Sequence, residues 1–310
     1  MISRQLFFLC SVTLILGCDR KPAPGSTADS LPPAAADTVI TIDSLATPES
    51  ALHDSVQDVY LVSNINGSPS DADNNGFISR VRPDGSVEAL RFIAGGVNGV
   101  TLNAPKGMAL RGDSLWVSDI TAVRVFNART GASIATIDFK SRGAVFLNDV
   151  AAAPDGSIYI TDTGVRIANG EFSHPGPDRI FRIGPDGKVS VVMTGTKLGQ
   201  PNGLAWDPSS NRMLLASLGD STIYAFAAGD TTLTPIVKGP GSYDGIEMLG
   251  GGQFVVSSHA VAAILVYRNG ALTAVIDSLQ DPADIGLDRK RNRVLIPSLG
   301  GNRLDIRPLR

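Results

Sequence analysis

Short apolar runs separated by polar turns recur along most of the chain. In residues 201–217 a short strand is followed by a polar turn at Asp207–Asn211 and by the apolar run Met213–Ser217. A strand–turn–strand unit that returns at a fixed period is the signature of a repeat architecture. Five other segments begin in the same way: Pro48-Glu49-Ser50, Pro105-Lys106-Gly107, Leu147-Asn148-Asp149, Tyr243-Asp244-Gly245 and Ala283-Asp284-Ile285.

Six copies between Pro48 and Arg310 give about 44 residues per copy, the length of a four-stranded propeller blade. We expect the second strand of each blade at Val59–Ser63, Leu115–Ser118, Ile158–Thr161, Met213–Ser217, Phe254–Ser258 and Arg293–Pro297. The sequence therefore predicts an all-β fold, a six-bladed β-propeller over residues 38–310.

The residues before the first copy predict how the ring closes. Val39–Ile42 alternates polar and apolar residues, as a strand does, while the last copy leaves room for only three strands. We expect this N-terminal strand to complete the last blade. Deleting residues 38–43 would then leave an open sheet edge and an aggregation-prone protein.

The N-terminal segment predicts a lipoprotein. Residues 1–17 combine a basic start with the apolar run Leu6–Leu16, and Ile15-Leu16-Gly17-Cys18 resembles a bacterial lipobox with Cys18 as the lipidated residue. Residues 18–37 are rich in Pro, Ala and Ser, the composition of an unstructured tether. We expect a protein of the bacterial cell envelope, lipid-anchored on the outer side of the cytoplasmic membrane or in the periplasm. An ordinary signal peptide or an uncleaved anchor is the alternative.

The net charge of the chain limits the classes of molecule that it is expected to bind. The 310 residues carry a formal net charge of −3 with both signs mixed, which argues against binding to a nucleic acid. We expect a monomer that binds a small molecule and contacts the membrane only through its lipid.

Two insertions interrupt the repeats. The first ends in Asp71-Ala72-Asp73-Asn74-Asn75-Gly76 and resembles the start of a calcium loop, but Arg82 stands where a bidentate Glu is needed. A polar loop leading into a strand at Phe77–Val81 is the preferred interpretation. The second insertion, Gly164–Pro177, includes His174 and is expected at one mouth of the channel, where it would shape a substrate pocket.

The second residue of each copy is polar or charged, although the residues that follow are largely apolar. These residues are Glu49, Lys106, Asn148, Asn202, Asp244 and Asp284. If each holds the same place in its blade, all six converge on one end of the channel with a net formal charge of −2, from three carboxylates and one ammonium. Carboxylates so close repel unless a cation joins them, and an all-oxygen set suits calcium. A merely water-filled channel is the alternative.

The residues around these positions resemble the family of senescence marker protein, gluconolactonase and luciferin-regenerating enzyme, which is similar in plan to the paraoxonases. The resemblance covers residues 48–310 and implies that Glu49, Asn202 and Asp244 bind one divalent cation, with Asn148 near the substrate. The matching motifs are Pro48-Glu49-Ser50, Pro201-Asn202-Gly203, Asp244-Gly245-Ile246 and Asn148-Asp149-Val150.

Three departures from that pattern bear on the substrate. Phe146 stands where the family's sugar-lactone enzymes carry an Arg, so a different or more apolar substrate is expected. Glu49-Ser50-Ala51 replaces the usual Glu-Gly-Pro. Lys106 is also unexpected on the axis, where its ammonium would pair with Glu49 or Asp284, or would take the place of the metal.

The resemblance implies a metal-dependent hydrolase of a lactone or related ester. The predicted site has Glu49, Asn148, Asn202 and Asp244 as ligands of one divalent cation, calcium first. Asp244 and Asp284 are the candidates for proton transfer, while Asn148, Lys106 and His259 are candidates for substrate binding. The alternative function is a non-catalytic propeller that binds a ligand or a protein partner, with the metal structural or absent.

Overall fold

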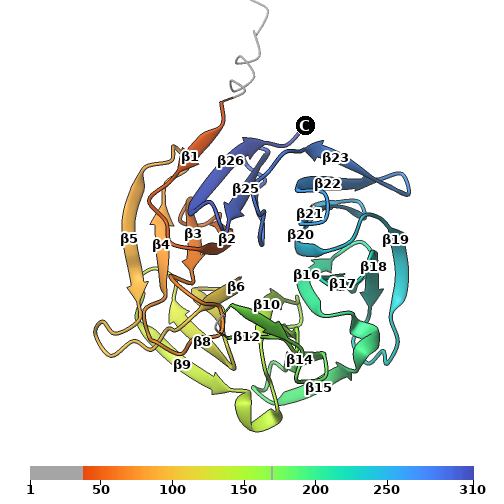
Figure 1. The fold of residues 1–310 in the computed structure, drawn as a ribbon, viewed down its shortest axis with the longest axis horizontal. Helices are drawn as coiled ribbons and strands as arrows, with labels where there is room; N and C mark the ends of the chain where they lie inside the picture. Colours follow the sequence, from red (N-terminus) through yellow and green to blue (C-terminus); the bar gives the residue numbers. More distant parts are fainter. Residues whose placement is uncertain (1–37, 169) are drawn as a thin grey trace, which may run out of the picture. The chain divides into compact units, whose positions relative to one another are not determined.

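The computed structural model describes residues 38–168 and 170–310, which form six four-stranded antiparallel sheets and one two-stranded ribbon. Figure 1 shows the sheets arranged as blades around a common axis. The predicted six-bladed propeller is therefore confirmed. The predicted signal peptide, Cys18 and the whole predicted tether, residues 18–37, lie outside the described residues. No helix within the described ranges is long and apolar enough to cross a membrane.

Five blades each take their four strands from one continuous stretch of the chain. The first blade consists of β2 (Pro48–Asp54), β3 (Val59–Asn64), β4 (Phe77–Val81) and β5 (Val87–Ala94), and the second of β6 (Pro105–Arg111), β7 (Ser114–Asp119), β8 (Ala122–Asn127) and β9 (Ser133–Asp138). The third blade consists of β10 (Leu147–Ala152), β11 (Ile158–Asp162), β14 (Arg179–Ile183) and β15 (Val189–Thr194), and the fourth of β16 (Pro201–Asp207), β17 (Arg212–Ser217), β18 (Thr222–Phe226) and β19 (Thr234–Lys238). The fifth blade consists of β20 (Tyr243–Gly250), β21 (Gln253–Ser258), β22 (Ala263–Arg268) and β23 (Ala271–Ile276).

The sixth blade combines both ends of the described chain. It consists of β24 (Gly286–Asp288), β25 (Arg293–Ser298), β26 (Arg303–Pro308) and β1 (Ile40–Ile42). β1 pairs antiparallel with β26, with Ile40 opposite Ile306 and Ile42 opposite Leu304. This confirms the predicted closure, in which the N-terminal strand supplies the outer edge of the last blade.

The remaining elements lie between blades or within the third one. The ribbon of β12 (Arg166–Ala168) and β13 (Glu171–Ser173) is inserted between β11 and β14, and two single-turn 3₁₀ helices cover Lys140–Arg142 and Thr196–Leu198. The first insertion forms a polar loop before β4, which is the interpretation that the sequence favoured. Within this loop Asn75 Nδ2 donates a hydrogen bond of 2.6 Å to Asp73 Oδ2.

Burial falls from the channel to the rim, because inner strands are covered on both faces by neighbouring blades. β17 is buried at five of its six positions, whereas β9, an outermost strand, is exposed at five of six. Apolar side chains of adjacent blades form shared clusters. Phe139 and Phe181, for example, meet edge to face with centroids 5.0 Å apart between the second and third blades. This packing makes the ring a rigid frame for the side chains at its axis.

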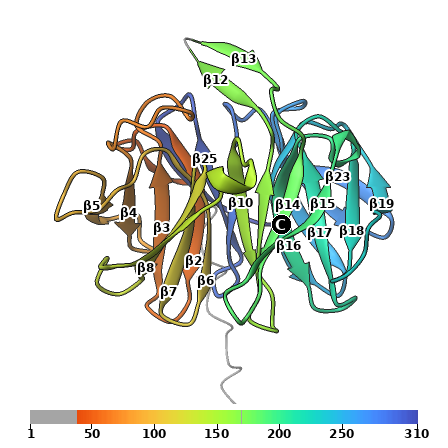
Figure 2. The same cartoon turned by 90° about the horizontal axis from the view of Figure 1, so that it is seen from below.

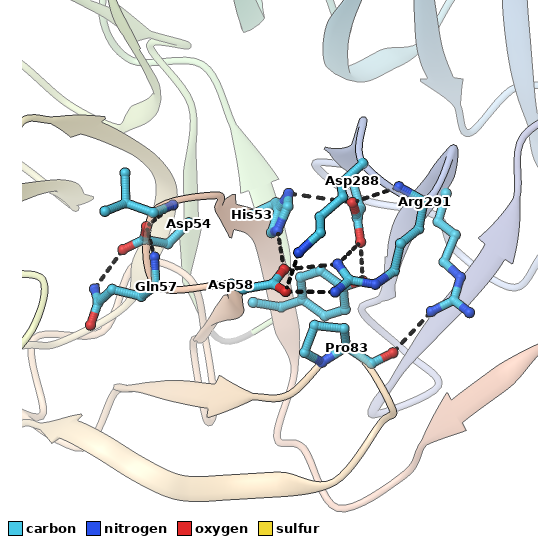
Figure 3. Close-up of polar contacts among 11 residues, drawn as sticks. His53, Asp54, Gln57, Asp58, Pro83, Asp288 and Arg291 are labelled. Atoms are coloured by element: carbon cyan, nitrogen blue, oxygen red, sulfur yellow. Dashed lines mark hydrogen bonds and ion pairs between the residues drawn. The ribbon is translucent and has the colours of Figure 1, made fainter.

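A polar network joins the first and last blades (Figure 3). Arg291, in the turn before β25, donates to Asp58 at 2.8 and 2.6 Å and to Asp288 at 2.9 Å. The buried Asp288 also accepts a hydrogen bond of 2.6 Å from Tyr60. The two ends of the propeller are thus tied by charge-assisted hydrogen bonds as well as by the β1–β26 pairing.

Candidate functional site

An irregularity in the innermost strands exposes one side chain per blade to the channel. In five blades the ladder shifts register just after the first residue of the inner strand, for example between Pro201 and Leu204 and between Tyr243 and Ile246. The residue in second position lies in this irregular step, where a β-bulge re-aims the side chain. The residues so placed are Glu49, Lys106, Asn148, Asn202 and Asp244.

These five residues line one cavity of about 470 Å³ at one mouth of the channel. They come from five successive blades, so the predicted convergence is correct for five of the six positions. His259, the residue after β21, and Phe146, just before β10, line the same cavity. The volume lies within the range of small-molecule sites in proteins.

The two carboxylates of this set each keep a buried oxygen without a protein donor. Glu49 and Asp244 are 5% and 4% exposed, and Glu49 Oε2 and Asp244 Oδ1 have no hydrogen-bond partner among the described residues. Burial, and then the charge of Asp244, raise the pKa of Glu49 well above its usual range. Two carboxylates left in this state are expected to attract a cation.

The two amides can complete such a site. Asn148 donates through Nδ2 to Thr163 Oγ1 at 3.1 Å, and Asn202 donates through Nδ2 to the carbonyl of Tyr243 at 3.4 Å. Each amide nitrogen therefore donates a hydrogen bond to the protein, and each side-chain carbonyl oxygen remains available to a ligand in the cavity. Two carboxylates and two amide oxygens suit a hard cation such as calcium.

His259 forms a hydrogen bond with the carboxylate of Asp244. His259 Nε2 lies 3.0 Å from Asp244 Oδ2, and His259 Nδ1 lies 3.2 Å from Asp281 Oδ1. Burial lowers the pKa of His259, but hydrogen bonds to the two aspartates outweigh this effect and raise the pKa to about 10. The ring is thus a cation at neutral pH that can donate to both carboxylates.

Lys106 is enclosed beside this set. Its side chain is fully buried; Nζ donates to the carbonyl of Ala104 at 3.1 Å and lies 4.2 Å from the ring centroid of Phe146. Burial lowers the pKa of Lys106 to about 8, against the opposing charges of Glu49 and Asp119. No carboxylate of the described chain lies within 4.0 Å of Nζ. The expected pairing of Lys106 with Glu49 or Asp284 is therefore absent.

Sequence comparison decides the family. The family model for the SMP-30/Gluconolactonase/LRE-like region matches residues 78–278. This chain belongs to that family. The match includes Lys106, Asn148, Asn202 and Asp244, whereas Glu49 precedes it. No protein in the search of curated proteins matches the chain.

Solved structures agree with the propeller fold of this SMP-30/gluconolactonase/LRE-like protein. A gluconolactonase from Xanthomonas campestris is 23% identical, with a TM-score of 0.67 over 88% of this chain and 89% of its own. A putative gluconolactonase is 18% identical, with a TM-score of 0.62 over 87% of this chain and 92% of its own. At such identities the likeness shows the shared fold.

The sixth axial position of this family member differs from the sequence prediction. Pro282 pairs with Ser298, the last residue of β25, just as Tyr243 pairs with Ser258 at the end of β21. The residue in second position of the sixth blade is therefore Ala283, and Asp284 lies one step deeper. The alignment was wrong by one residue here, because Ala283-Asp284-Ile285 resembles Tyr243-Asp244-Gly245.

Asp284 lies deeper in the channel than Glu49 and Asp244, in a second layer of side chains that faces the opposite mouth. It lines a separate cavity of about 530 Å³ together with Asp149, and its Oδ2 accepts a hydrogen bond of 2.5 Å from Ser50. Burial, and then the charge of Asp149, raise the pKa of Asp284 well above its usual range. The carboxylate is thus separated in register from the Glu49–Asp244 layer that it was expected to join.

Sequence reasoning missed the part played by Asp149. Its oxygens accept hydrogen bonds of 2.6 Å from the backbone amides of Leu204 and Val150, so it connects the third and fourth blades. A Cβ on Gly107 would come within 2.3 Å of Asp149 Oδ1, which explains the glycine in the neighbouring blade. Only the Asn-Asp pair in the sequence hinted at this second carboxylate.

Proposed function

We propose that this protein is a metal-dependent hydrolase of a lactone or related ester. The single observation that carries the proposal is the pair of unpartnered buried oxygens, Glu49 Oε2 and Asp244 Oδ1, in one cavity with two asparagines. Within the described ranges, no group of three or more His, Cys, Asp or Glu side chains is arranged to hold a metal. The proposed set instead consists of two carboxylates and two amides.

In this proposal Glu49, Asn148, Asn202 and Asp244 hold one divalent cation, calcium first. The cation, when bound, supplies Lewis-acid polarisation of the acyl carbonyl. Glu49 and Asp244, whose charges repel each other, would both be stabilised by the positive charge of that cation.

Side chains of the protein supply the proposed proton acceptor and a positive charge near the reacting carbonyl. His259 fixes the Asp244 carboxylate within the cavity, so Asp244, besides holding the cation, is the candidate acceptor for the proton of the attacking water. The nearby charge of Lys106 favours negative charge that develops on the acyl oxygen. Asp284, the second candidate base, lines the other cavity with Asp149, and Asp244 is accordingly the stronger assignment.

We further propose that the enzyme is a monomer tethered through Cys18 in the bacterial cell envelope. The support is the N-terminal pattern of a basic start, an apolar run and a lipobox-like ending.

The function is tested by assaying a panel of lactones and aryl esters with the wild-type protein and with Asp244→Ala, each with and without a chelator. We expect hydrolysis that is lost with the chelator and with the substitution. An intact fold with no hydrolysis of any substrate would instead favour the non-catalytic binding protein. A melting temperature that falls with the chelator, without any turnover, would indicate a purely structural metal.

A further inference from the structure

The inserted ribbon presents an apolar face to the proposed active site. Figure 2 shows β12 and β13 projecting from one end of the ring. Ile167 and Phe172 are directly opposite each other in this ribbon, so their side chains lie on the same face. Both line the cavity that contains Glu49 and Asp244. The next pair, Ala168 and Glu171, faces the other way.

Phe172 is exposed where a soluble protein would normally bury an aromatic ring. Its exposed fraction is 53%, although it lies at the entrance of a cavity. A two-stranded ribbon is marginally stable alone, and this one is tied to the first blade, because Ile167 N donates to Ser70 Oγ at 3.0 Å. The chain therefore holds an exposed aromatic ring over its polar site, and a ligand that covers this ring would bury it.

Beneath the ribbon, part of the cavity wall is apolar, while Glu49, Lys106 and Asp244 are buried at its floor and the half-exposed Asp281 also lines it. Side chains from four blades contribute to this wall: Ile65, Pro69, Val165, Leu218 and Leu299. Phe146 continues the apolar surface down to Lys106, over which its ring lies. A polyhydroxylated ligand would lose hydrogen bonds to water along this wall without replacing them.

We infer that the substrate is a lactone or ester with an apolar alkyl or aryl arm, and that Phe172 determines this specificity. The inference rests on the proposed function. The acyl carbonyl lies at the floor, near Glu49 and Asp244, and the arm lies against Ile167 and Phe172. Water adds to the acyl carbon and the acyl carbon–oxygen bond breaks. A lactone then gives one hydroxy acid, whereas an ester gives a carboxylic acid and an alcohol, and the acid releases one proton at neutral pH.

The test uses γ-lactones whose alkyl substituent lengthens from none to five carbons, with glucono-δ-lactone as the polar comparison. For the wild-type protein we expect kcat/KM to rise about fourfold for each methylene that the ribbon buries. Phe172→Ala should flatten this dependence and lower kcat/KM for the longest lactone about tenfold, while γ-butyrolactone is hydrolysed as before. Phe172→Leu should retain most of the dependence, and Glu171→Ala, on the opposite face, should leave it unchanged.

A preference of the wild-type protein for glucono-δ-lactone, or an equal loss on all lactones in Phe172→Ala, would overturn the inference. Binding of the corresponding γ-lactams, measured by calorimetry, separates this failure from failure of the proposed function. If no lactone is hydrolysed but lactam affinity rises with chain length and falls in Phe172→Ala, the apolar-arm site stands and the hydrolase proposal fails. If neither hydrolysis nor lactam affinity depends on chain length, the inference is wrong.

Discussion

His259 Nε2 lies 3.0 Å from Asp244 Oδ2, and the other oxygen of Asp244 is buried without a partner among the described residues. The histidine therefore fixes the orientation of the carboxylate without occupying the oxygen that a cation would need. His259 is itself held by Asp281 at 3.2 Å, which keeps the ring in place.

The first prediction concerns this histidine. His259→Ala should weaken calcium binding about tenfold, because residues that orient metal ligands typically contribute 10–100-fold to affinity. His259→Gln, which keeps a hydrogen-bond donor, should retain most of the affinity. Calorimetric titration with calcium measures both. His174→Ala is the matched control, since His174 also pairs with an aspartate, Asp178 at 2.6 Å, but does not line the cavity. Tighter calcium binding by His259→Ala would show that removing its positive charge matters more than losing its hydrogen bond.

The second prediction concerns the buried ammonium of Lys106. Because burial lowers its pKa from 10.5 to about 8, the folded state binds this proton less tightly than the unfolded state. The wild-type protein should thus gain stability as the pH rises from about 8 to 10.5. Lys106→Met should be more stable than wild type by about 1–3 kcal/mol at pH 7, and the difference should shrink across that window.

Chemical denaturation at several pH values checks this difference. Lys188→Met is the control, since the side chain of Lys188 is 87% exposed and its removal should leave the pH dependence unchanged. A Lys106→Met protein that is less stable than wild type at pH 7 would mean that its contacts with Ala104 and Phe146 outweigh the burial of its charge.

The third prediction concerns ring closure. Asp288→Ala should lower the free energy of unfolding by about 2–4 kcal/mol, because it leaves Tyr60 and Arg291 without their buried acceptor. Burial raises the pKa of Asp288, but hydrogen bonds from Tyr60 and Arg291 outweigh burial and lower it below 3.8. The stabilisation is therefore present above pH 3.8 and is lost as the pH falls through the lowered pKa.

Thermal and denaturant unfolding test this contribution. Arg129→Ala removes an exposed ion pair with Asp113 and should change stability by less than about 1 kcal/mol. Equal effects of Asp288→Ala and Arg129→Ala would show that the network between the first and last blades adds nothing beyond a surface contact.

The fourth prediction concerns the N-terminus. Cys18→Ser should move the protein from the membrane fraction to the soluble fraction and remove the mass of the attached lipid. Fractionation and mass spectrometry of the protein expressed in bacteria measure both. Cys10→Ser, within the expected signal peptide, should leave the lipid in place. A membrane-bound Cys18→Ser protein of unprocessed mass would indicate an uncleaved anchor instead.

Much of the fold could be predicted because each blade repeats the same local pattern. Strand–turn–strand units such as 201–217 recur at one period, and the short strand before the first copy had only one open edge to join, beside β26. Convergence at the axis followed from this symmetry. Glu49 and Asp244 could thus be brought together although many residues separate them.

The remaining features depend on contacts that a repeat pattern does not encode. Asp284 was misplaced because one residue of register decides which layer of the channel a side chain enters. The pairing of Pro282 with Ser298 fixes that register, and a sequence pattern does not show it. The bond from His259 to Asp244 and the apolar face of Ile167 and Phe172 arise from the meeting of separate segments. The insertion that carries the ribbon was recognised, but its pairing was not.

The most direct test of the account is elemental analysis of the purified protein without its signal peptide, after dialysis against calcium, beside Glu49→Gln and Asp244→Asn. The account predicts about one equivalent of divalent cation in the wild-type protein and a large loss in each variant. Wild-type protein without a bound cation, or variants that retain it fully, would contradict the proposal that these two carboxylates hold a metal at the channel mouth.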